Sequence, residues 1–373
     1  MAGSVFGKIF RISTWGESHG KGIGVVIDGC PAGMKLSEED IQPYLDRRKP
    51  GRNEFATPRS ESDTAEILSG VFEGVTTGTP ISIAIMNKTQ RSGDYSEIAQ
   101  VYRPGHADYT FDQKYGIRDY RGGGRSSGRE TAARVAAGAV AAKLLGEMGI
   151  TVNAYTLSIG DIRADVQNGD IALALSDPLC MPDSGASRRA QEYLRGLREK
   201  GDSAGGVVEC VIKGIPAGLG ETVFDKYDAR LAQAVMSIGA VKGVEIGAGF
   251  EAAGKCGTED NDPFLISADG TVTKGSNNSG GILGGMSDGI SPVVVRAAFK
   301  ATPSVSAAQR TVDKDGAERE IRIKGRHDPV IVPRAVVVVE AMAALVTADL
   351  LLENMASRLD GIKRFYGLQE ARD

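Results

Sequence analysis

Two long segments of this chain are apolar around their whole circumference, and they constrain its fold more than any other feature. Residues 127–145 are rich in alanine, and residues 334–352 are rich in valine, alanine and leucine. A helix without a polar face is buried on all sides. We therefore predict helices over Ser127–Leu145 and Arg334–Leu352, each enclosed between other layers of the protein. The apolar stretch from Val330 to Leu352, which contains the second segment, is interrupted by Pro333, Arg334, Glu340 and Asp349, so we expect no membrane span there.

Shorter patterns predict the elements around these helices. Runs of β-branched residues bounded by glycine or proline predict strands over Gly22–Ile27, Ile81–Met86, Thr151–Leu157, Gly206–Ile212, Gly243–Gly247 and Pro292–Phe299. Further helices are predicted over Ser37–Arg48, Ala186–Lys200 and Tyr227–Val235. Ser127 and Glu130 have the spacing of a capping box, which would begin the first apolar helix.

The order of the motifs indicates a diverged internal duplication. Glu17–Gly33 and Asp202–Gly218 both read as a turn of small residues, a β-branched strand and a Pro-Ala-Gly turn. Two further pairs follow in the same order: Gly74–Lys88 with Gly285–Lys300, and Pro104–Asp108 with Gly325–Pro329. We predict one domain over 1–373, with pseudo-repeats at about 7–150 and 195–353. The expected fold class is α/β of the α+β kind: a duplicated β-α-β sandwich, with central helices buried between two antiparallel sheets.

Composition excludes several classes of protein. The chain has 373 residues, and its 44 basic and 48 acidic side chains give a net charge of −4, which argues against nucleic acid as a partner. The four cysteines lack metal-site spacing, so we expect no metal and a reducing, cytoplasmic location. The first residues lack the pattern of a signal peptide. We therefore expect a protein of the cytoplasm that acts on small molecules.

The three histidines point to acid–base chemistry. His19, His106 and His327 each lie among glycine, proline and charged residues, outside any apolar stretch. Histidine exchanges protons near neutral pH, so three such residues in loops are typical of an active site. The alternative is that each is simply an exposed loop residue.

The strongest local motif is an anion site at residues 121–130, Arg-Gly-Gly-Gly-Arg-Ser-Ser-Gly-Arg-Glu. Glycines let the backbone approach a phosphate, and Ser126, Ser127 and the amides of a helix start can donate to it. Arg121, Arg125 and Arg129 oppose the helix dipole, so an anion there would offset their cost. A flexible surface loop with a basic cap is the alternative. The P-loop and GxGxxG patterns both fail, because Arg129-Glu130 replaces Lys-Ser/Thr and Gly128 is out of register.

Two further basic segments suggest more than one anionic group. The first is residues 46–52, at the end of the Ser37 helix, where dipole effects alone also favour basic residues. The second comprises residues 300–304 and 324–328, which combine lysine, arginine and hydroxyl groups with His327 and Asp328. We therefore expect small, strongly anionic ligands.

Together these motifs resemble one family. Trp15–Gly20, Asp46–Gly51, Arg103–Asp108, Tyr120–Thr131 and Gly325–Pro329 are similar, in this order, to the motifs of chorismate synthases. The likeness runs from about Gly7 to the helix ending near Leu352. It implies a lyase that uses reduced FMN (FMNH2) for a 1,4-anti elimination of phosphate from 5-enolpyruvylshikimate 3-phosphate. The product, chorismate, completes the shared part of the shikimate pathway to the aromatic amino acids.

The resemblance also implies roles for individual residues. His19 would be the general acid at the departing phosphate, His106 would hold or protonate the reduced flavin, and Asp328 would help to remove the C6 proton. His327 would have a supporting role. The substrate would be bound by Arg48, Arg129, Arg134, Arg326 and Ser127. The flavin would be bound by Arg48, Arg125, Ser126, Ser127, Gly239, Ala240, Gly285, Lys300, Ala301, Thr302, Pro303, Ser304 and Arg326.

Finally, the resemblance implies helices sandwiched between two antiparallel sheets and a homotetramer. NADPH is a candidate source of reducing equivalents, although the chain has no dinucleotide fingerprint, so we expect external reduction. Glu54 stands where some relatives carry a basic residue, which puts one contact near Arg48 in doubt. Arg52 is a candidate to make that contact instead. Two rival functions are an ATP-dependent phosphotransferase, which would need a P-loop lysine, and a non-catalytic anion-binding regulator, which would not need His19, His106 and Asp328.

Overall fold

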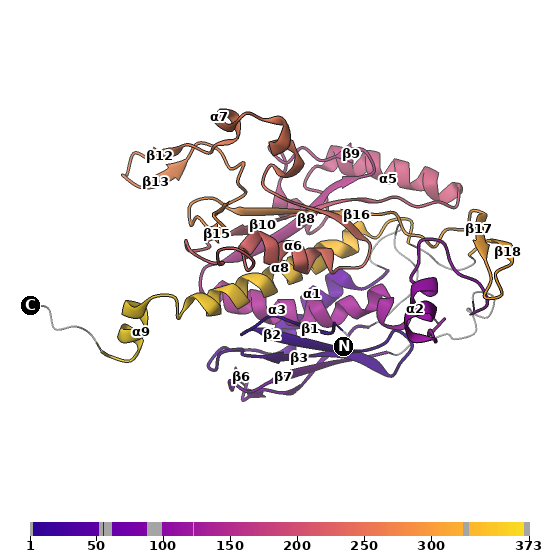
Figure 1. Ribbon diagram of the computed structural model, residues 1–373, viewed down its shortest axis with the longest axis horizontal. Helices are drawn as coiled ribbons and strands as arrows, with labels where there is room; N and C mark the ends of the chain where they lie inside the picture. The colour runs from indigo at the N-terminus through magenta and orange to yellow at the C-terminus, as the bar shows by residue number, and fades with distance from the viewer. Residues whose placement is uncertain are drawn as a thin grey trace, which may run out of the picture.

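In the part of the chain that the structure describes, helices pack between two five-stranded β-sheets (Figure 1). The computed structural model describes residues 3–51, 55, 62–87, 99–121, 123–323 and 328–368. The first sheet has the order β1-β2-β3-β7-β4, with β1 Val5–Phe6, β2 Arg11–Gly16, β3 Gly22–Asp28, β7 Ile81–Met86 and β4 Ala65–Ser69. The second has the order β11-β16-β10-β8-β9, with β11 Val241–Ile246, β16 Val293–Phe299, β10 Gly206–Lys213, β8 Thr151–Ile159 and β9 Ile162–Arg163. All neighbouring strands in both sheets are antiparallel, which confirms the predicted fold class.

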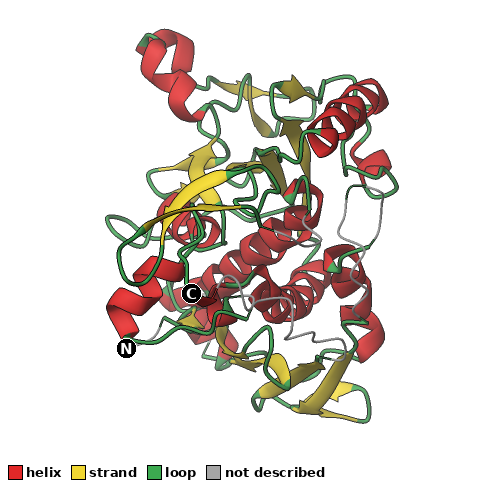
Figure 2. Ribbon diagram, turned by 90° about the vertical axis from the view of Figure 1, so that its right-hand side faces the viewer, coloured by secondary structure: helices red, strands yellow, loops and turns green. Residues whose placement is uncertain are grey.

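Helices occupy both the interior and the rim of the molecule (Figures 1 and 2). Between the sheets lie α1 Glu38–Arg48, α3 Thr131–Glu147, α6 Tyr227–Met236 and α8 Val332–Asn354. The remaining helices are α2 Asp108–Tyr115, α4 Ile171–Ala174, α5 Ser184–Glu199, α7 Gly257–Asp260 and α9 Leu359–Phe365. Four two-stranded hairpins complete the fold: β5 Val71–Phe72 with β6 Val75–Thr76, β12 Phe264–Ile266 with β13 Val272–Lys274, β14 Ile282–Leu283 with β15 Met286–Ser287, and β17 Gln309–Val312 with β18 Glu318–Ile321.

The two apolar helices are buried, as predicted. In α3 most residues between Thr131 and Leu145 are buried, and in α8 every residue over 335–350 is buried. By length and mean hydropathy α8 resembles a membrane span, but 89% of its most apolar window is buried inside the protein, as expected for a core helix. It crosses α3 at Gly138, where an added Cβ would lie 2.5 Å from the Cα of Ala341. Glycine at this position therefore lets the two helices approach closely.

The predicted strands and helices are all present, with ends shifted by a few residues. The capping box at Ser127 is wrong. Ser127 instead caps a 3₁₀ turn, Gly128–Glu130, by accepting from the Arg129 amide, and α3 begins only at Thr131. The Ser127 amide donates to Gly124 O at 3.3 Å and the Glu130 amide donates to Ser127 O at 3.1 Å, so 3₁₀ turns engage both amides that a capping box would use. The Glu130 carboxylate accepts from Arg134 Nε at 2.9 Å.

Matching features recur in the two halves of the molecule. The two sheets have the same strand order when the second is read in reverse. In this comparison β2 corresponds to β8, β3 to β10, β7 to β16 and β4 to β11. A hydroxyl also closes the same turn in each half. Thr76 Oγ1 donates to Pro31 O at 2.7 Å and accepts from Met34 N, while Ser287 Oγ donates to Pro216 O at 2.6 Å and accepts from Leu219 N. A duplicated unit would produce this arrangement, and the predicted bounds of the two repeats stay a prediction.

Candidate active site

A buried carboxylate joins two of the arginines that were predicted to bind substrate. Asp63 precedes β4 and is fully buried. It accepts from Arg48 Nη1 at 2.7 Å and also from Arg129 Nη1. Burial opposes ionisation of Asp63, but the charges of Arg48 and Arg129 outweigh it and hold the pKa of Asp63 below its ordinary value. Asp63 therefore fixes the separation of the two guanidinium groups.

Arg48 also connects this pair to Asp328. Its carbonyl accepts from Arg334 Nε at 3.1 Å, and Arg334 Nη1 donates to Asp328 at 2.5 Å. The Nε of Arg48 donates to Thr131 Oγ1 at 3.3 Å, at the start of α3. Burial, with the nearby charges of Arg334 and Arg129, lowers the pKa of Arg48 to about 10. The cluster thus has an excess of positive charge, which a bound anion would balance.

His19 lies in the turn between β2 and β3, next to this cluster. Its Nδ1 is 3.1 Å from Ser18 Oγ. The turn is held by Asn87, whose Nδ2 donates to the carbonyls of Glu17 at 3.0 Å and Gly20 at 2.9 Å. Asn87 Oδ1 accepts from Arg129 Nε at 3.0 Å. The structure therefore brings the His19 turn to the arginine cluster.

His106 lies at the other end of the glycine-rich segment. A Cβ added to Gly123 would be 3.1 Å from His106 Cε1, so only glycine allows this approach. Arg103 Nη2 is 3.1 Å from His106 Nδ1, and Asp108 Oδ1 is 3.3 Å from the same nitrogen. Arg103 can only donate, so the neutral ring accepts at Nδ1 and carries its proton on Nε2. Arg103 and Asp108 thus fix the orientation of the imidazole ring.

The segment of residues 300–304 packs against the His106 loop. Lys300 Nζ donates to Gly105 O at 2.6 Å, and a Cβ on Gly105 would lie 3.2 Å from Pro303 Cβ. Lys300 N also donates to Ala240 O at 3.0 Å. Ser203 Oγ donates to Thr302 O at 2.8 Å. Predicted flavin residues from three distant parts of the chain therefore lie together.

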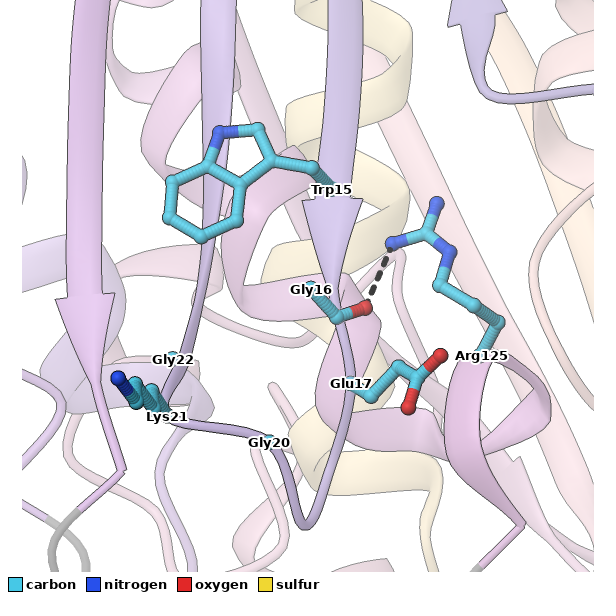
Figure 3. Close-up of a pocket in the computed structure, with 7 residues that line it drawn as sticks. All are labelled: Trp15, Gly16, Glu17, Gly20, Lys21, Gly22 and Arg125. Atoms are coloured by element: carbon cyan, nitrogen blue, oxygen red, sulfur yellow. Dashed lines mark hydrogen bonds between the residues drawn. The ribbon is translucent and has the colours of Figure 1, made fainter. Parts of the chain in front are cut away.

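Arg125 faces a hollow on the outside of the His19 turn. It lines a cavity of about 290 Å³ with Trp15, Gly16, Glu17, Gly20, Lys21 and Gly22 (Figure 3). Its guanidinium donates to Gly16 O at 3.2 Å and to Thr14 Oγ1 at 2.8 Å. Arg125 therefore ties the glycine-rich segment to β2, and its role toward a flavin phosphate stays a prediction.

Two other predicted residues are engaged elsewhere. Arg134 donates from Nε to Glu130 at 2.9 Å and from Nη1 to Ser237 Oγ at 2.6 Å, beside Gly239 and Ala240. Gly285 lies in the β14–β15 turn, where its carbonyl accepts from Tyr227 N at the start of α6. It is thus at the opposite end of α6 from Ala240.

Some predictions concern residues that the structure does not describe. Arg326, His327, Arg52 and Glu54 lie outside the described residues. Their assigned roles stay predictions.

Two residues that were predicted to bind a ligand each have a buried polar atom without a hydrogen-bond partner among the described residues. The atoms are Nη2 of Arg129 and Oγ1 of Thr302. A buried donor without a partner is costly, and a ligand phosphate or carboxylate would satisfy it. One atom lies in the arginine cluster and the other beside the His106 loop, so the residues present fit both an anionic substrate and a phosphate-bearing cofactor.

Sequence reasoning missed several members of the site. Asp63 and Asn87 lie in segments without a recognisable motif, and Arg334 was assigned only to a helix. Arg103 and Asp108 were quoted as part of a motif without a role. The pairing of charges across distant segments becomes visible only in the fold.

Comparisons with known proteins agree on one family. A family model described as chorismate synthase matches residues 10–352. A protein of Lachnoclostridium phytofermentans named chorismate synthase is 63% identical over 366 residues, which cover 98% of this chain and 100% of the relative. A protein of Methanosarcina mazei with the same name is 57% identical over 357 residues, covering 95% and 97%. A solved structure titled "Crystal Structure of Chorismate Synthase" has a TM-score of 0.74 and 36% identity, covering 97% of each chain.

Proposed function

This chain belongs to the chorismate synthase family, and from that premise we propose how its own side chains bind the substrate and move protons. It is a lyase that converts 5-enolpyruvylshikimate 3-phosphate to chorismate and phosphate by a 1,4-anti elimination. Enzymes of this family use reduced FMN and complete the shared part of the shikimate pathway.

The arginine cluster binds the substrate in this proposal. The substrate carries a phosphate and two carboxylates, and the cluster of Arg48, Arg129 and Arg334 has an excess of positive charge around Asp63 and Asp328. Arg129 keeps one buried nitrogen, Nη2, without a partner among the described residues. This unpaired donor is the observation that carries the proposal, because a buried donor needs an acceptor, and a phosphate or carboxylate of the substrate would supply one. Ser127 and Arg134, also predicted to bind substrate, stay further candidates.

His19 acts as the general acid at the departing phosphate. Its turn is joined to Arg129 through Asn87, so a phosphate bound by Arg129 would lie beside the turn that carries the imidazole. A leaving phosphate accumulates negative charge, and a proton from a neighbouring imidazolium offsets it. Asp328 takes part in removing the C6 hydrogen, since Arg334 keeps its carboxylate in place at 2.5 Å.

The His106 side of the site holds the flavin. Gly123 and Gly105 allow the chain to lie close to His106 and Pro303, Gly105 is exposed, and Ser126 and Thr302 supply hydroxyl groups. Reduced FMN, when bound, supplies electron density transiently as the phosphate leaves. His106 presents Nε2–H when Arg103 donates to its Nδ1, and this proton would be directed toward the cofactor.

Three further properties belong to the proposal. The chain acts in the cytoplasm as a homotetramer, with NADPH as a source of the electrons that reduce FMN. Support for assembly comes from the β12–β13 hairpin, where Phe264 is 61% and Ile266 is 70% exposed. Apolar side chains at such exposure are typical of a surface that a second copy covers.

An anaerobic turnover experiment tests the reaction. Purified protein, 5-enolpyruvylshikimate 3-phosphate and chemically reduced FMN are mixed, and chorismate is followed by its absorbance. We expect product only when reduced FMN is present, and NADPH can then be tried as the reductant. A folded protein that binds FMN and makes no chorismate would overturn the proposal.

A further inference from the structure

We propose that Asn87 is a positioning residue that ties the His19 turn to Arg129, so that the proton donor and the anion-binding arginine are placed together. The inference rests on the proposed roles of His19 and Arg129. Asn87 itself touches neither substrate nor cofactor in this proposal, and it acts through the residues that it holds.

The strand register places Asn87 beside the turn. Met86, the last residue of β7, pairs with Gly22, the first residue of β3. Asn87 follows directly, and its amide donates to Lys21 O at 3.0 Å. Its side chain therefore lies where the chain between β2 and β3 reverses.

The side chain of Asn87 uses both of its ends. Nδ2 donates to Glu17 O at 3.0 Å, to Gly20 O at 2.9 Å and to Ser18 O at 3.4 Å. The residues on both sides of His19 in the sequence are therefore bonded to Asn87. Oδ1 accepts from Arg129 Nε at 3.0 Å. One amide thus links a turn and an arginine that are far apart in sequence.

Arg129 is held at a second point, and this leaves one nitrogen for a ligand. Its Nη1 donates to the buried Asp63, and Nε donates to Asn87. Nη2 is buried and has no partner among the described residues. Because a guanidinium is rigid and planar, fixing two of its nitrogens also fixes the direction of the third.

Replacing Asn87 by aspartate separates the two ends of the link. Asn87→Asp keeps an oxygen that accepts from Arg129, but it loses the Nδ2 donor and places a carboxylate against the turn carbonyls. We expect kcat to fall by about 10–100-fold, as for a catalytic group displaced by about 1 Å, with KM within about threefold. Asn87→Ala removes both ends, and we expect kcat to fall and KM to rise.

The controls distinguish this role from a purely structural one. Asn153→Asp makes the same chemical change at an exposed position of β8 and should leave kcat and KM unchanged. In a double-mutant cycle, we compare kcat/KM of the two single variants with that of the double variant. Asn87→Ala combined with Arg129→Lys should lower kcat/KM by less than the product of the two single fold-changes, because both substitutions remove the same contact. A Tm measurement shows whether each variant is folded.

The experiments distinguish a failure of the proposed function from a failure of the inference about Asn87. If the wild-type protein makes no chorismate with reduced FMN, the proposed function fails. If it is active, the inference is overturned by an Asn87→Asp variant that is folded and as active as Asn153→Asp, by equal changes in kcat and KM in that variant, or by strictly multiplicative effects in the cycle.

Discussion

Arg129→Lys is the substitution that tests the arginine cluster most directly. The guanidinium of Arg129 directs Nε to Asn87 and Nη1 to Asp63, and leaves Nη2 for an anion. A lysine ammonium has one nitrogen at the end of a flexible chain, so it cannot keep these contacts in one geometry. We expect it to stay beside the buried Asp63 and to lose the ligand.

The size of the effect follows from the contact that is lost. A hydrogen bond to a charged group contributes about 1.5–3 kcal/mol. Since about 1.4 kcal/mol corresponds to a factor of ten, kcat/KM should fall by about 10–150-fold. Stability should change little, because a cation still faces Asp63.

Arg11→Lys is the matched control outside the arginine cluster. Arg11 is exposed and its Nη2 donates to Asp28 at 3.3 Å, so we expect kcat/KM to stay unchanged. The assay is the initial rate of chorismate formation under anaerobic conditions, at varied substrate and saturating reduced FMN. The reasoning is refuted if folded Arg129→Lys retains the wild-type kcat/KM, or if the kcat/KM of Arg11→Lys falls as much as that of Arg129→Lys.

Three more outcomes are expected. His106→Ala should lower turnover by about 10²–10⁴-fold, measured in the same assay, and a folded variant with wild-type turnover would remove His106 from catalysis. Arg125→Ala should weaken FMN binding in a flavin titration, through a lost phosphate contact or through release of the segment tied to Thr14, and unchanged affinity would contradict both. Gly138→Ala should lower stability by about 1–3 kcal/mol through overpacking, because its Cβ would lie 2.3 Å from Ala341 Cβ. Gly146 has open space around it, so Gly146→Ala should not lower the stability of the protein. Thermal melts of the two variants measure both effects.

Periodicity predicted most of the fold. The buried helices α3 and α8 followed from their lack of a polar face, and the strands β3 and β7 followed from β-branched runs between turns. The start of α3 was misplaced because two 3₁₀ turns, Gly124–Ser126 and Gly128–Glu130, precede the helix, which begins at Thr131.

The site was predicted less completely. Residues in unusual local motifs, such as His106 in Arg103–Asp108 and Lys300 in the basic segment 300–304, could be found from the sequence alone. Asp63 and Asn87 could not, because an isolated carboxylate or amide has no local signature and becomes significant only when the strand register brings it to Arg129. Long-range charge pairing is the part that local patterns do not contain.

The direction of the central helices explains why the site lies at one end of them. Thr131, at the start of α3, and Arg334, at the start of α8, both contact Arg48, while Gly138 meets Ala341 further along the two helices. The helices therefore run in the same sense, and the positive ends of their dipoles meet at Arg48. Arginines at that point raise the free energy of the protein without ligand. The pKa of Arg48 is lowered by burial and, in addition, by the charges of Arg334 and Arg129. A substrate with a phosphate and two carboxylates neutralises this excess of positive charge. Relief of the repulsion among the arginines of the ligand-free protein therefore favours the binding of a polyanion.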